Sequence, residues 1–565
     1  MGKKILIVGG VAGGASVAAR ARRIDASADI VMFEKGPNVS FSNCSLPFYL
    51  SGVVAASESL IMMEPEAFKN SYDIEARTDT EVTAIDRAAK KITAKDLKTG
   101  KEYEEDYDVL VLSPGARPVR PRSIKGIDGK NVFTIRNVVD ITKLKTYLDE
   151  NDIKDTVVVG GGFIGVEVTE NLRMSGRNVV LVEALDQIMM PFDYDMAQIL
   201  HKKMLDEGVD LILSDGVSEI RDSSVVLASG KEINAGAVIM AVGIAPDIAL
   251  AKDAGIETGE LGGIKVDEHY RTNDENIYAV GDAIEVKDFF TGKSTKLALA
   301  GPAQKEARAA ADAIYGKYDR NQGVIGSSVV KMFDLNAAAT GMNEKKAKAA
   351  GINYEIVYVA PMDKVGIMPG ASPIHLKLIF EVPSGRVLGA QAIGMGNVDK
   401  RIDVIATVIH MKGTVGDLAD LELCYAPYFG TAKDAVNFAG LVAQNLLDGV
   451  FKQVHVGDVR KLLEEGAYIV DIREPEEYEQ GHIVTAVNIP LSQLRKRMDE
   501  IPKDRPVYLH CRTSQRSYNA LMALKGNGWN DLYNISGSYL ELSYFEYFDD
   551  KRLGRKPILT DYNFE

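Results

Sequence analysis

A cysteine and an arginine five positions later form a candidate chemical site near the C-terminal end of the sequence. Cys511 and Arg516 lie in a loop that follows an apolar strand expected at residues 507–509, and a helix should begin soon after Cys511. Such a loop directs successive backbone N–H groups, and the positive end of the helix dipole, toward the cysteine sulfur and anything attached to it. Only four residues separate Cys511 from Arg516, which is a short loop for a phosphate. The pattern therefore favours a sulfur species bound to Cys511.

Two glycine-rich turns each follow an apolar strand and precede an expected helix. The first turn holds Gly9, Gly10, Ala12, Gly13 and Gly14, with Val11 where a further glycine is usual, and the second holds Gly160, Gly161, Gly162, Phe163, Ile164 and Gly165. After each helix comes a second strand that ends at an acid, Glu34 or Glu183. Glycines let a diphosphate approach the backbone and the N-terminus of the helix, while the acid accepts hydrogen bonds from a ribose. The sequence therefore predicts two dinucleotide sites.

The acid of the second turn bears on the choice of nicotinamide. Glu183 would repel the 2′-phosphate of NADP, and its neighbour Ala184 offers no compensating cation. Arg177 is the nearby cation that weakens this inference. We expect NADH to be preferred over NADPH.

Length and composition indicate how many domains the chain has and which classes of partner are disfavoured. The 565 residues exceed one compact core, and the net charge of −14 disfavours nucleic acid and anionic membranes as partners. The N-terminus enters a strand at once, and no apolar run reaches the roughly 20 residues that would cross a bilayer, so we expect a cytoplasmic protein. The three cysteines, Cys44, Cys424 and Cys511, are far apart and odd in number, which argues against a disulfide scaffold and against a metal site.

Residues 1 to about 445 resemble the flavoprotein disulfide reductases, whose first dinucleotide site takes FAD and whose second takes a nicotinamide. Around Cys44, the string Ser40-Phe41-Ser42-Asn43-Cys44-Ser45-Leu46-Pro47 holds one cysteine rather than the usual pair. It is similar to coenzyme A disulfide reductases and to their relatives, the NADH-dependent persulfide reductases and single-cysteine NADH oxidases. Residues 455–545, with the Cys511 loop and the segments at 471–478, 481–483 and 488–490, resemble a rhodanese domain, although an inactive module stays possible.

The resemblance implies an α/β fold with two Rossmann-like domains. We expect an FAD-binding domain at 1–150 and 270–325, an NAD-binding domain at 151–269, an α+β dimerisation domain at 326–448 and an α/β rhodanese domain at 455–565.

The resemblance also assigns residues to roles. Cys44, Cys511, Tyr425 and Arg516 would be catalytic, and Tyr425 would reach across a homodimer to the partner's flavin site. FAD would contact Gly9, Gly10, Ala12, Gly13, Gly14, Glu34, Lys35, Asn43, Val82, Ser113, Pro114, Gly115, Asp282, Ala298 and Tyr425. The nicotinamide would contact Gly160, Gly162, Phe163, Ile164, Gly165, Glu183 and Gly243. A phosphorylated thiol would contact Ser16, Arg20, Arg23, Ser40, Asn43 and Lys433.

Some of these assignments have plain structural alternatives. Asp282 could only cap a helix, Arg22 and Arg23 could form a solvated helix face, and Cys424 is interpreted as a packing residue. A second tyrosine that the family places within residues 366–369 is missing here, which puts its contribution to the thiolate in doubt.

Our hypothesis is an NADH-dependent FAD enzyme that reduces coenzyme A persulfide, coenzyme A disulfide or polysulfide. Cys44 would form the reducible sulfur species, and Cys511 would carry sulfane sulfur as a persulfide and pass it to coenzyme A. An NADH oxidase or peroxidase cycling through a sulfenic acid at Cys44 is the alternative, but it leaves Arg20, Arg23 and Lys433 without a purpose. A non-catalytic sulfur carrier or redox sensor would leave the second dinucleotide site unused.

Overall fold

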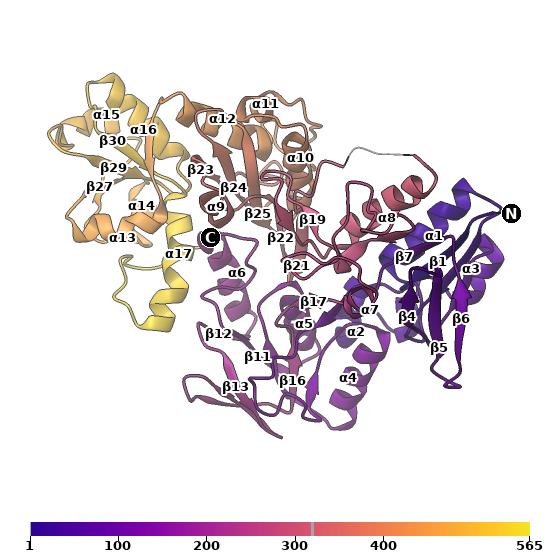
Figure 1. Ribbon diagram of the computed structural model, residues 1–565. Coiled ribbons are helices and arrows are strands. Elements are labelled where there is room, and N and C mark those ends of the chain that lie inside the picture. Colours follow the sequence, from indigo (N-terminus) through magenta and orange to yellow (C-terminus); the bar gives the residue numbers. More distant parts are fainter. Residues whose placement is uncertain (1, 318–320, 565) are drawn as a thin grey trace. The chain divides into compact units, whose positions relative to one another are not determined.

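The structure is a computed structural model that describes residues 2–317 and 321–564 (Figure 1). The chain forms two compact units. The first comprises Met1–Ala184 and Ser214–Val324, and the second comprises Leu185–Leu213 and Ile325–Glu565.

The first unit is built around two parallel sheets. One has the order β18-β7-β1-β2-β3, with β1 (Lys4–Val8), β2 (Asp29–Phe33), β3 (Glu75–Arg77), β7 (Val109–Leu112) and β18 (Ile277–Ala279). The other contains the run β11-β10-β16-β9, with β9 (Val132–Phe133), β10 (Asp155–Val159), β11 (Asn178–Glu183) and β16 (Ala237–Met240). Their central strands are almost continuously apolar and buried, as expected for parallel sheets covered on both faces.

Helices cover these sheets, and short antiparallel strands complete the first unit. The helices are α1 (Ala12–Ile24), α2 (Phe48–Ser51), α3 (Pro65–Tyr72), α4 (Val138–Glu150), α5 (Phe163–Met174), α7 (Ala249–Asp253) and α8 (Ala300–Ile314), with 3-10 turns η1 (Asn43–Ser45), η2 (Ser57–Leu60) and η3 (Gly281–Ala283). The other strands are β4 (Thr80–Asp86), β5 (Lys91–Asp96), β6 (Glu102–Asp106), β8 (Ala116–Pro118), β13 (Val217–Ile220), β14 (Ser224–Leu227), β15 (Glu232–Asn234), β17 (Ile244–Pro246), β19 (Val286–Lys287) and β20 (Ser294–Thr295). Helices α1 and α8 pack side by side.

The second unit contains an antiparallel sheet of order β21-β22-β25-β24-β23. Its strands are β21 (Ser328–Met332), β22 (Leu335–Gly341), β23 (Tyr354–Val359), β24 (Ile374–Glu381) and β25 (Val387–Gly394), and the same unit holds α6 (Tyr194–Asp206), β12 (Asp210–Leu213), α9 (Glu344–Ala349), α10 (Val398–His410), α11 (Val415–Asp420) and α12 (Ala435–Leu447). Residues 374–380 are all buried, so this strand lies in a core.

A five-stranded parallel sheet forms the C-terminal part of the second unit, in the order β26-β30-β29-β27-β28. Its strands are β26 (Lys452–Val454), β27 (Tyr468–Asp471), β28 (Val487–Asn488), β29 (Val507–His510) and β30 (Leu532–Ile535), and its helices are α13 (Val456–Glu464), α14 (Pro475–Glu479), α15 (Leu494–Arg497), α16 (Gln515–Gly526) and α17 (Ser538–Leu553), with the 3-10 turn η4 (Met498–Glu500). The α/β fold class predicted from the sequence is confirmed. Within residues 2–317 and 321–564, no helix has the length and apolar content needed to cross a membrane.

A buried lysine joins three elements of the second unit. The Lys377 ammonium on β24 lies 2.6 Å from Glu344 Oε1, 2.7 Å from Asp195 Oδ2 and 3.2 Å from Asp193 Oδ2. Burial opposes the charged form, but the carboxylates raise the pKa of Lys377 above its ordinary value. These three carboxylates have the spacing of metal ligands. The ammonium already supplies a cation there, so the cluster is a structural tie between α6, α9 and β24.

The same region holds a carboxyl group that lacks a partner. Glu541, in the first turn of α17, is only 1% exposed, and neither of its oxygens has a hydrogen-bond partner among the described residues. His375 Nδ1 lies 3.9 Å away and is already hydrogen-bonded to the Tyr358 hydroxyl at 2.5 Å. Burial, with the charge of Asp195, raises the pKa of Glu541 well above its ordinary value. The folded protein therefore holds the proton of this carboxyl more strongly than the unfolded chain does.

We expect the substitution Glu541→Gln to remove a pH-dependent loss of stability. The unfolded chain releases this proton above about pH 4.3, whereas the folded protein releases it at a higher pH, so between these two pKa values the wild type loses stability as pH rises, by up to about 1.4 kcal/mol per pH unit. Glutamine is neutral throughout. Thermal unfolding midpoints should be measured at several pH values between about 5 and 8. The midpoint of the variant should rise relative to that of the wild type as pH rises.

Glu464→Gln is the matched control, because this glutamate is exposed on α13 of the same region. Its unfolding midpoint should differ from the wild type by a constant amount. A difference between Glu541→Gln and the wild type that does not change with pH would contradict the buried, protonated carboxyl.

Candidate functional site

The first glycine-rich turn lies where β1 meets α1. Gly9 has φ +97°, and a Cβ on Gly14 would lie 1.8 Å from the Gly9 carbonyl oxygen, so the helix begins directly against the strand end. Val11 precedes the helix without a side-chain cap, which leaves the N–H groups of the first turn to an external anion. Glu34 Oε2 accepts a hydrogen bond from the Gly10 N–H at 3.0 Å. The predicted acid is thus at the turn.

Other residues predicted to hold FAD lie in the same unit as this turn. The Ser113 N–H donates to the Val8 carbonyl at 2.8 Å, and Pro114 and Gly115 follow directly. Val82 is buried in β4, while Lys35 is exposed and paired with Glu81 at 2.6 Å. Asn43 is exposed in η1.

Asp282 in η3 provides a test of whether the residues fit a flavin dinucleotide. It lines a small hollow of about 50 Å³ with Ala298. Burial raises the pKa of Asp282. An acceptor in a hollow and an uncapped helix N-terminus suit hydroxyl and diphosphate groups, so these residues fit FAD.

The second glycine-rich turn repeats the construction of the first. Gly160 has φ +108°, and a Cβ on Gly165 would lie 1.8 Å from the Gly160 carbonyl oxygen, as α5 begins at Phe163 and continues through Ile164. A Cβ on Gly162 would meet open space, and Gly243 has φ +104°. Glu183 Oε2 accepts a hydrogen bond from the Gly161 N–H at 2.7 Å. The turn therefore suits a second dinucleotide.

Arg177 is engaged away from this acid. Its Nη2 donates to Asp149 Oδ1 at 2.7 Å, its Nη1 donates to Ser175 Oγ at 2.7 Å, and its Nε donates to the Ile153 carbonyl at 3.2 Å. These three contacts fix the guanidinium between the end of α4, the loop that follows α4 and the end of α5. It is not placed to neutralise a phosphate beside Glu183.

Cys44 lies in η1 and is accessible to solvent. Partial desolvation raises the pKa of its thiol, and the charges of Glu167 on α5 and Asp282 in η3 raise it further. The helix α2 that follows the thiol is tied to α5, because the Ser51 hydroxyl donates to Asn171 Oδ1 at 2.6 Å. The helix α5, which follows the second dinucleotide turn, and the turn η3 thus act on this sulfur. Its thiolate needs a positive charge or a proton donor from a bound group.

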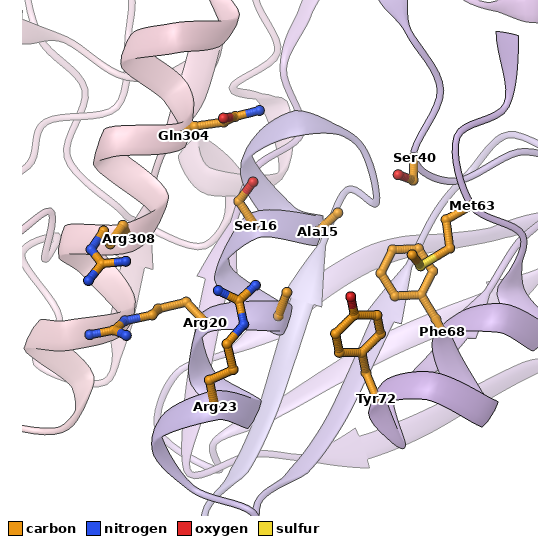
Figure 2. A pocket seen from close by; sticks show the side chains of 11 residues that line it. Ala15, Ser16, Arg20, Arg23, Ser40, Met63, Phe68, Tyr72, Gln304 and Arg308 are labelled. Atoms are coloured by element: carbon orange, nitrogen blue, oxygen red, sulfur yellow. The ribbon is translucent and has the colours of Figure 1, made fainter.

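A hollow of about 400 Å³ in the first unit collects four of the residues predicted to bind a phosphorylated thiol. It is lined by Ala15, Ser16, Ala19, Arg20, Arg23, Ser40, Met63, Phe68, Tyr72, Gln304 and Arg308. Figure 2 shows Arg20, Arg23 and Arg308 on one side and Met63, Phe68 and Tyr72 across from them. The site thus offers positive charge on one wall and apolar surface on the other.

Seven of the lining residues were not identified from the sequence: Ala15, Ala19, Met63, Phe68, Tyr72, Gln304 and Arg308. Phe68 and Tyr72 are four residues apart on α3, a spacing that also describes any helix with one packed face. Arg308 and Gln304 are separated by four residues on α8, which could be known to face α1 only from the fold.

Tyr425 and Lys433 belong to the second unit, and both are exposed. Tyr425 is followed by the exposed rings of Tyr428 and Phe429, and Cys424 is exposed rather than packed. A cluster of exposed aromatic residues marks an interaction surface, which agrees with the expected dimer contact of this segment. The packing role expected for Cys424 is not seen in the isolated chain.

Cys511 is buried, with 1% exposure, in the loop between β29 and α16. Its N–H donates to Ser538 Oγ at 3.2 Å, and the Ser517 hydroxyl lies 3.6 Å from its sulfur. Ser514 has φ +73°, a left-handed conformation that lets the loop turn around the sulfur.

Two arginines flank the Cys511 loop. Both guanidinium ends of Arg516 donate to Glu477, at 2.6 and 2.7 Å, and this pairing raises the pKa of Arg516. For Arg512, burial and the nearby Arg473 lower the pKa. Glu477 therefore orients Arg516, while Arg512 keeps its charge in an unfavourable setting that an anion would relieve.

Comparisons with known proteins identify the domains of the chain. The profile of the family described as pyridine nucleotide-disulphide oxidoreductase matches residues 3–307, its dimerisation domain matches 327–435, and a rhodanese-like domain matches 455–543. The coenzyme A disulfide reductase of Staphylococcus epidermidis is 33% identical over 442 residues, which cover 78% of this chain and 100% of that protein.

Two solved structures are similar over nearly the whole chain. The reduced Bacillus anthracis CoADR-RHD is 44% identical with a TM-score of 0.94, covering 96% of this chain and 98% of that one. The NAD-dependent persulfide reductase from A. fulgidus is 36% identical with a TM-score of 0.90, covering 96% of this chain and 99% of that one. The chain therefore belongs to the pyridine nucleotide-disulphide oxidoreductase family and carries a C-terminal rhodanese-like domain.

Proposed function

We propose that this chain is an FAD-dependent enzyme in which NADH reduces coenzyme A persulfide, coenzyme A disulfide or polysulfide at Cys44. One observation carries the proposal. A single accessible thiol lies in the same unit as two dinucleotide turns and a hollow lined by three arginines. A thiol that must meet a large phosphorylated partner needs this combination of access and local positive charge.

The chemistry at Cys44 is a cleavage of a sulfur–sulfur bond. The Cys44 thiolate attacks one sulfur of the substrate, the second sulfur leaves as a thiolate or hydrosulfide, and a mixed disulfide or persulfide remains on Cys44. Bound FAD would supply the two electrons of NADH to that bond. For coenzyme A persulfide, NADH and one proton yield NAD⁺, coenzyme A and hydrogen sulfide.

The second thiol extends the substrate range. Cys511 sits in a closed loop with backbone N–H groups, Ser517 and Ser538 around it, and Arg512 and Arg516 flank that loop. These groups support a persulfide on Cys511 as a negatively charged sulfur donor. We infer that this loop takes sulfane sulfur and passes it to coenzyme A, which carries it toward Cys44.

The proposed dimer completes the site from a second copy of the chain. Exposed Tyr425 and Lys433 lie in the unit that contains the dimerisation domain, and the first unit alone builds the hollow. Tyr425 would donate a hydrogen bond toward the thiolate, and Lys433 would add a cation for a phosphate. This arrangement offers the thiolate stabilisation that Glu167 and Asp282 oppose.

The preference for NADH rests on the environment of Glu183. Its carboxylate holds the Gly161 N–H, and Arg177 is bound to Asp149 instead of facing that acid. A 2′-phosphate would meet the negative charge of Glu183, and Arg177 is not placed to compensate that charge.

Removal of the Cys44 sulfur should abolish sulfur reduction. We expect Cys44→Ser to lower anaerobic NADH oxidation with coenzyme A persulfide or disulfide by about 100-fold or more, because serine is a far weaker nucleophile toward sulfur. Cys511→Ser should keep the reduction of coenzyme A persulfide and lose sulfide release from an inorganic sulfur donor with coenzyme A.

Cys424→Ser is the matched control and should retain both activities. Full sulfur-reducing activity in Cys44→Ser would overturn the proposal. Wild-type oxidation of NADH with peroxide or oxygen that exceeds the rate with every sulfur substrate would favour the oxidase alternative.

Changing the acid of the second turn should alter the choice of nicotinamide. We expect the wild type to favour NADH over NADPH in kcat/KM, and Glu183→Ser to reduce that preference about 10-fold by losing ribose hydrogen bonds and the repulsion of the 2′-phosphate. Steady-state kinetics with both nucleotides measures this. Arg177→Lys, which keeps the charge near Asp149, should leave the preference unchanged, and a wild type that prefers NADPH would refute the assignment.

A further inference from the structure

Helix α8 adds a cation, Arg308, to the hollow that Arg20 and Arg23 of α1 also line. Arg20 and Arg23 on α1 and Arg308 on α8 line the same space, although Arg308 follows them by more than 280 positions in the sequence. Figure 2 shows the three guanidinium groups on one wall. In a protein of net charge −14, three arginines on one wall are a local departure from the average surface.

A buried carboxylate sets the position of this wall. Asp312 has an 8% exposed side chain, and its Oδ1 accepts from Arg20 Nε at 2.8 Å and from Arg20 Nη2 at 2.5 Å. Two hydrogen bonds therefore fix Arg20. The single negative charge of Asp312 compensates only one of the three positive charges of Arg20, Arg23 and Arg308. The wall keeps an excess of positive charge.

Arg308 differs from Arg20 in having its donors available. Its side chain is 58% exposed, and its Nε lies 3.9 Å from Asp312 Oδ2, beyond hydrogen-bond distance. Among the described residues, no acceptor is recorded within hydrogen-bond reach of this guanidinium. Asp312 attracts the base of the guanidinium toward the hollow, and five N–H donors remain for an anion.

The opposite wall restricts the orientation of a ligand. Met63, Phe68 and Tyr72 present apolar and aromatic surface, which does not stabilise a charged group. A ligand with both an aromatic base and phosphates would place its phosphates on the arginine wall.

We propose that Arg308 is a further substrate-binding residue that contacts a phosphate of the phosphorylated thiol and helps to select it over a phosphate-free thiol. This inference rests on the proposed function, because it assumes that the hollow receives the coenzyme A part of the substrate. Arg308 binds the ligand directly. Asp312 acts through Arg20 and Arg308 as a positioning residue.

The test compares two disulfide substrates that differ in phosphate. With purified holoenzyme, we expect Arg308→Gln to raise the KM for coenzyme A disulfide and the Kd for coenzyme A, measured by isothermal titration calorimetry, about 3- to 10-fold. The kcat for coenzyme A disulfide and the KM for pantethine, which lacks phosphate, should stay within about 2-fold of the wild type. The dependence of the Kd on salt concentration should also weaken.

Lys305→Gln is the matched control, since it removes one cation from the same exposed face of α8 outside the lining of the hollow. Its Kd and KM values should match the wild type. The exposed position of Arg308 predicts unchanged folding, which the thermal unfolding midpoint checks.

Two results would overturn the inference while leaving the proposed function in place. One is unchanged coenzyme A binding in Arg308→Gln together with weakened binding in Arg20→Gln. The other is an equal rise of KM for coenzyme A disulfide and pantethine in Arg308→Gln. If the wild type neither binds coenzyme A nor prefers its disulfide to pantethine, both the inference and the proposed function fail.

Discussion

The close contact of a helix start with a strand end is the constraint on which both dinucleotide turns depend. At Gly14 and again at Gly165, a single added carbon would lie 1.8 Å from a glycine carbonyl oxygen. Only glycine permits this approach, so the helix dipole and its N–H groups are fixed at the edge of each sheet. Glu34 and Glu183 each accept a hydrogen bond from the backbone of their own turn. Cys44 is under the electrostatic influence of Glu167 on α5, the helix of the second turn, and of Asp282 in η3.

Much of this arrangement was predictable because it is local in the sequence. A strand, a glycine turn, a helix and an acid occur within a few dozen residues, and each step has its own steric or electrostatic signal. The grouping of Ser16, Arg20 and Arg23 follows from helical spacing on one face of α1. The fold class followed from the same order of elements.

The rest could not be predicted because it depends on which elements meet. The local sequence around Arg308, an alanine-rich helix, predicts an exposed arginine. Only the packing of α8 on α1 places Arg308 at the hollow. Glu541 is a similar case, since an acid in the first turn of a helix is ordinarily a favourable exposed residue. Its burial against β23 and β24 has no signal in the local pattern.

The second unit connects the Cys511 loop to the sheet of the dimerisation domain through one helix. The N–H groups of Tyr539 and Leu540, at the start of α17, donate to the carbonyls of Cys511 and Arg512, both at 3.1 Å. The next residue is Glu541, which lies beside His375. The geometry of the loop is therefore joined to a buried contact of another sheet, and not only to its own domain.

The two thiols differ in solvent accessibility, and this difference affects how easily other molecules reach each sulfur between turnovers. Cys44 is open to solvent, whereas Cys511 is enclosed. An enclosed sulfur can be attacked only by a nucleophile that is slim enough to enter and is aligned with the bond to be broken. If Cys511 carries sulfane sulfur as proposed, the opening of its loop would set how fast other thiols in the cell can remove that sulfur. The domain would then lose its bound sulfur slowly between turnovers.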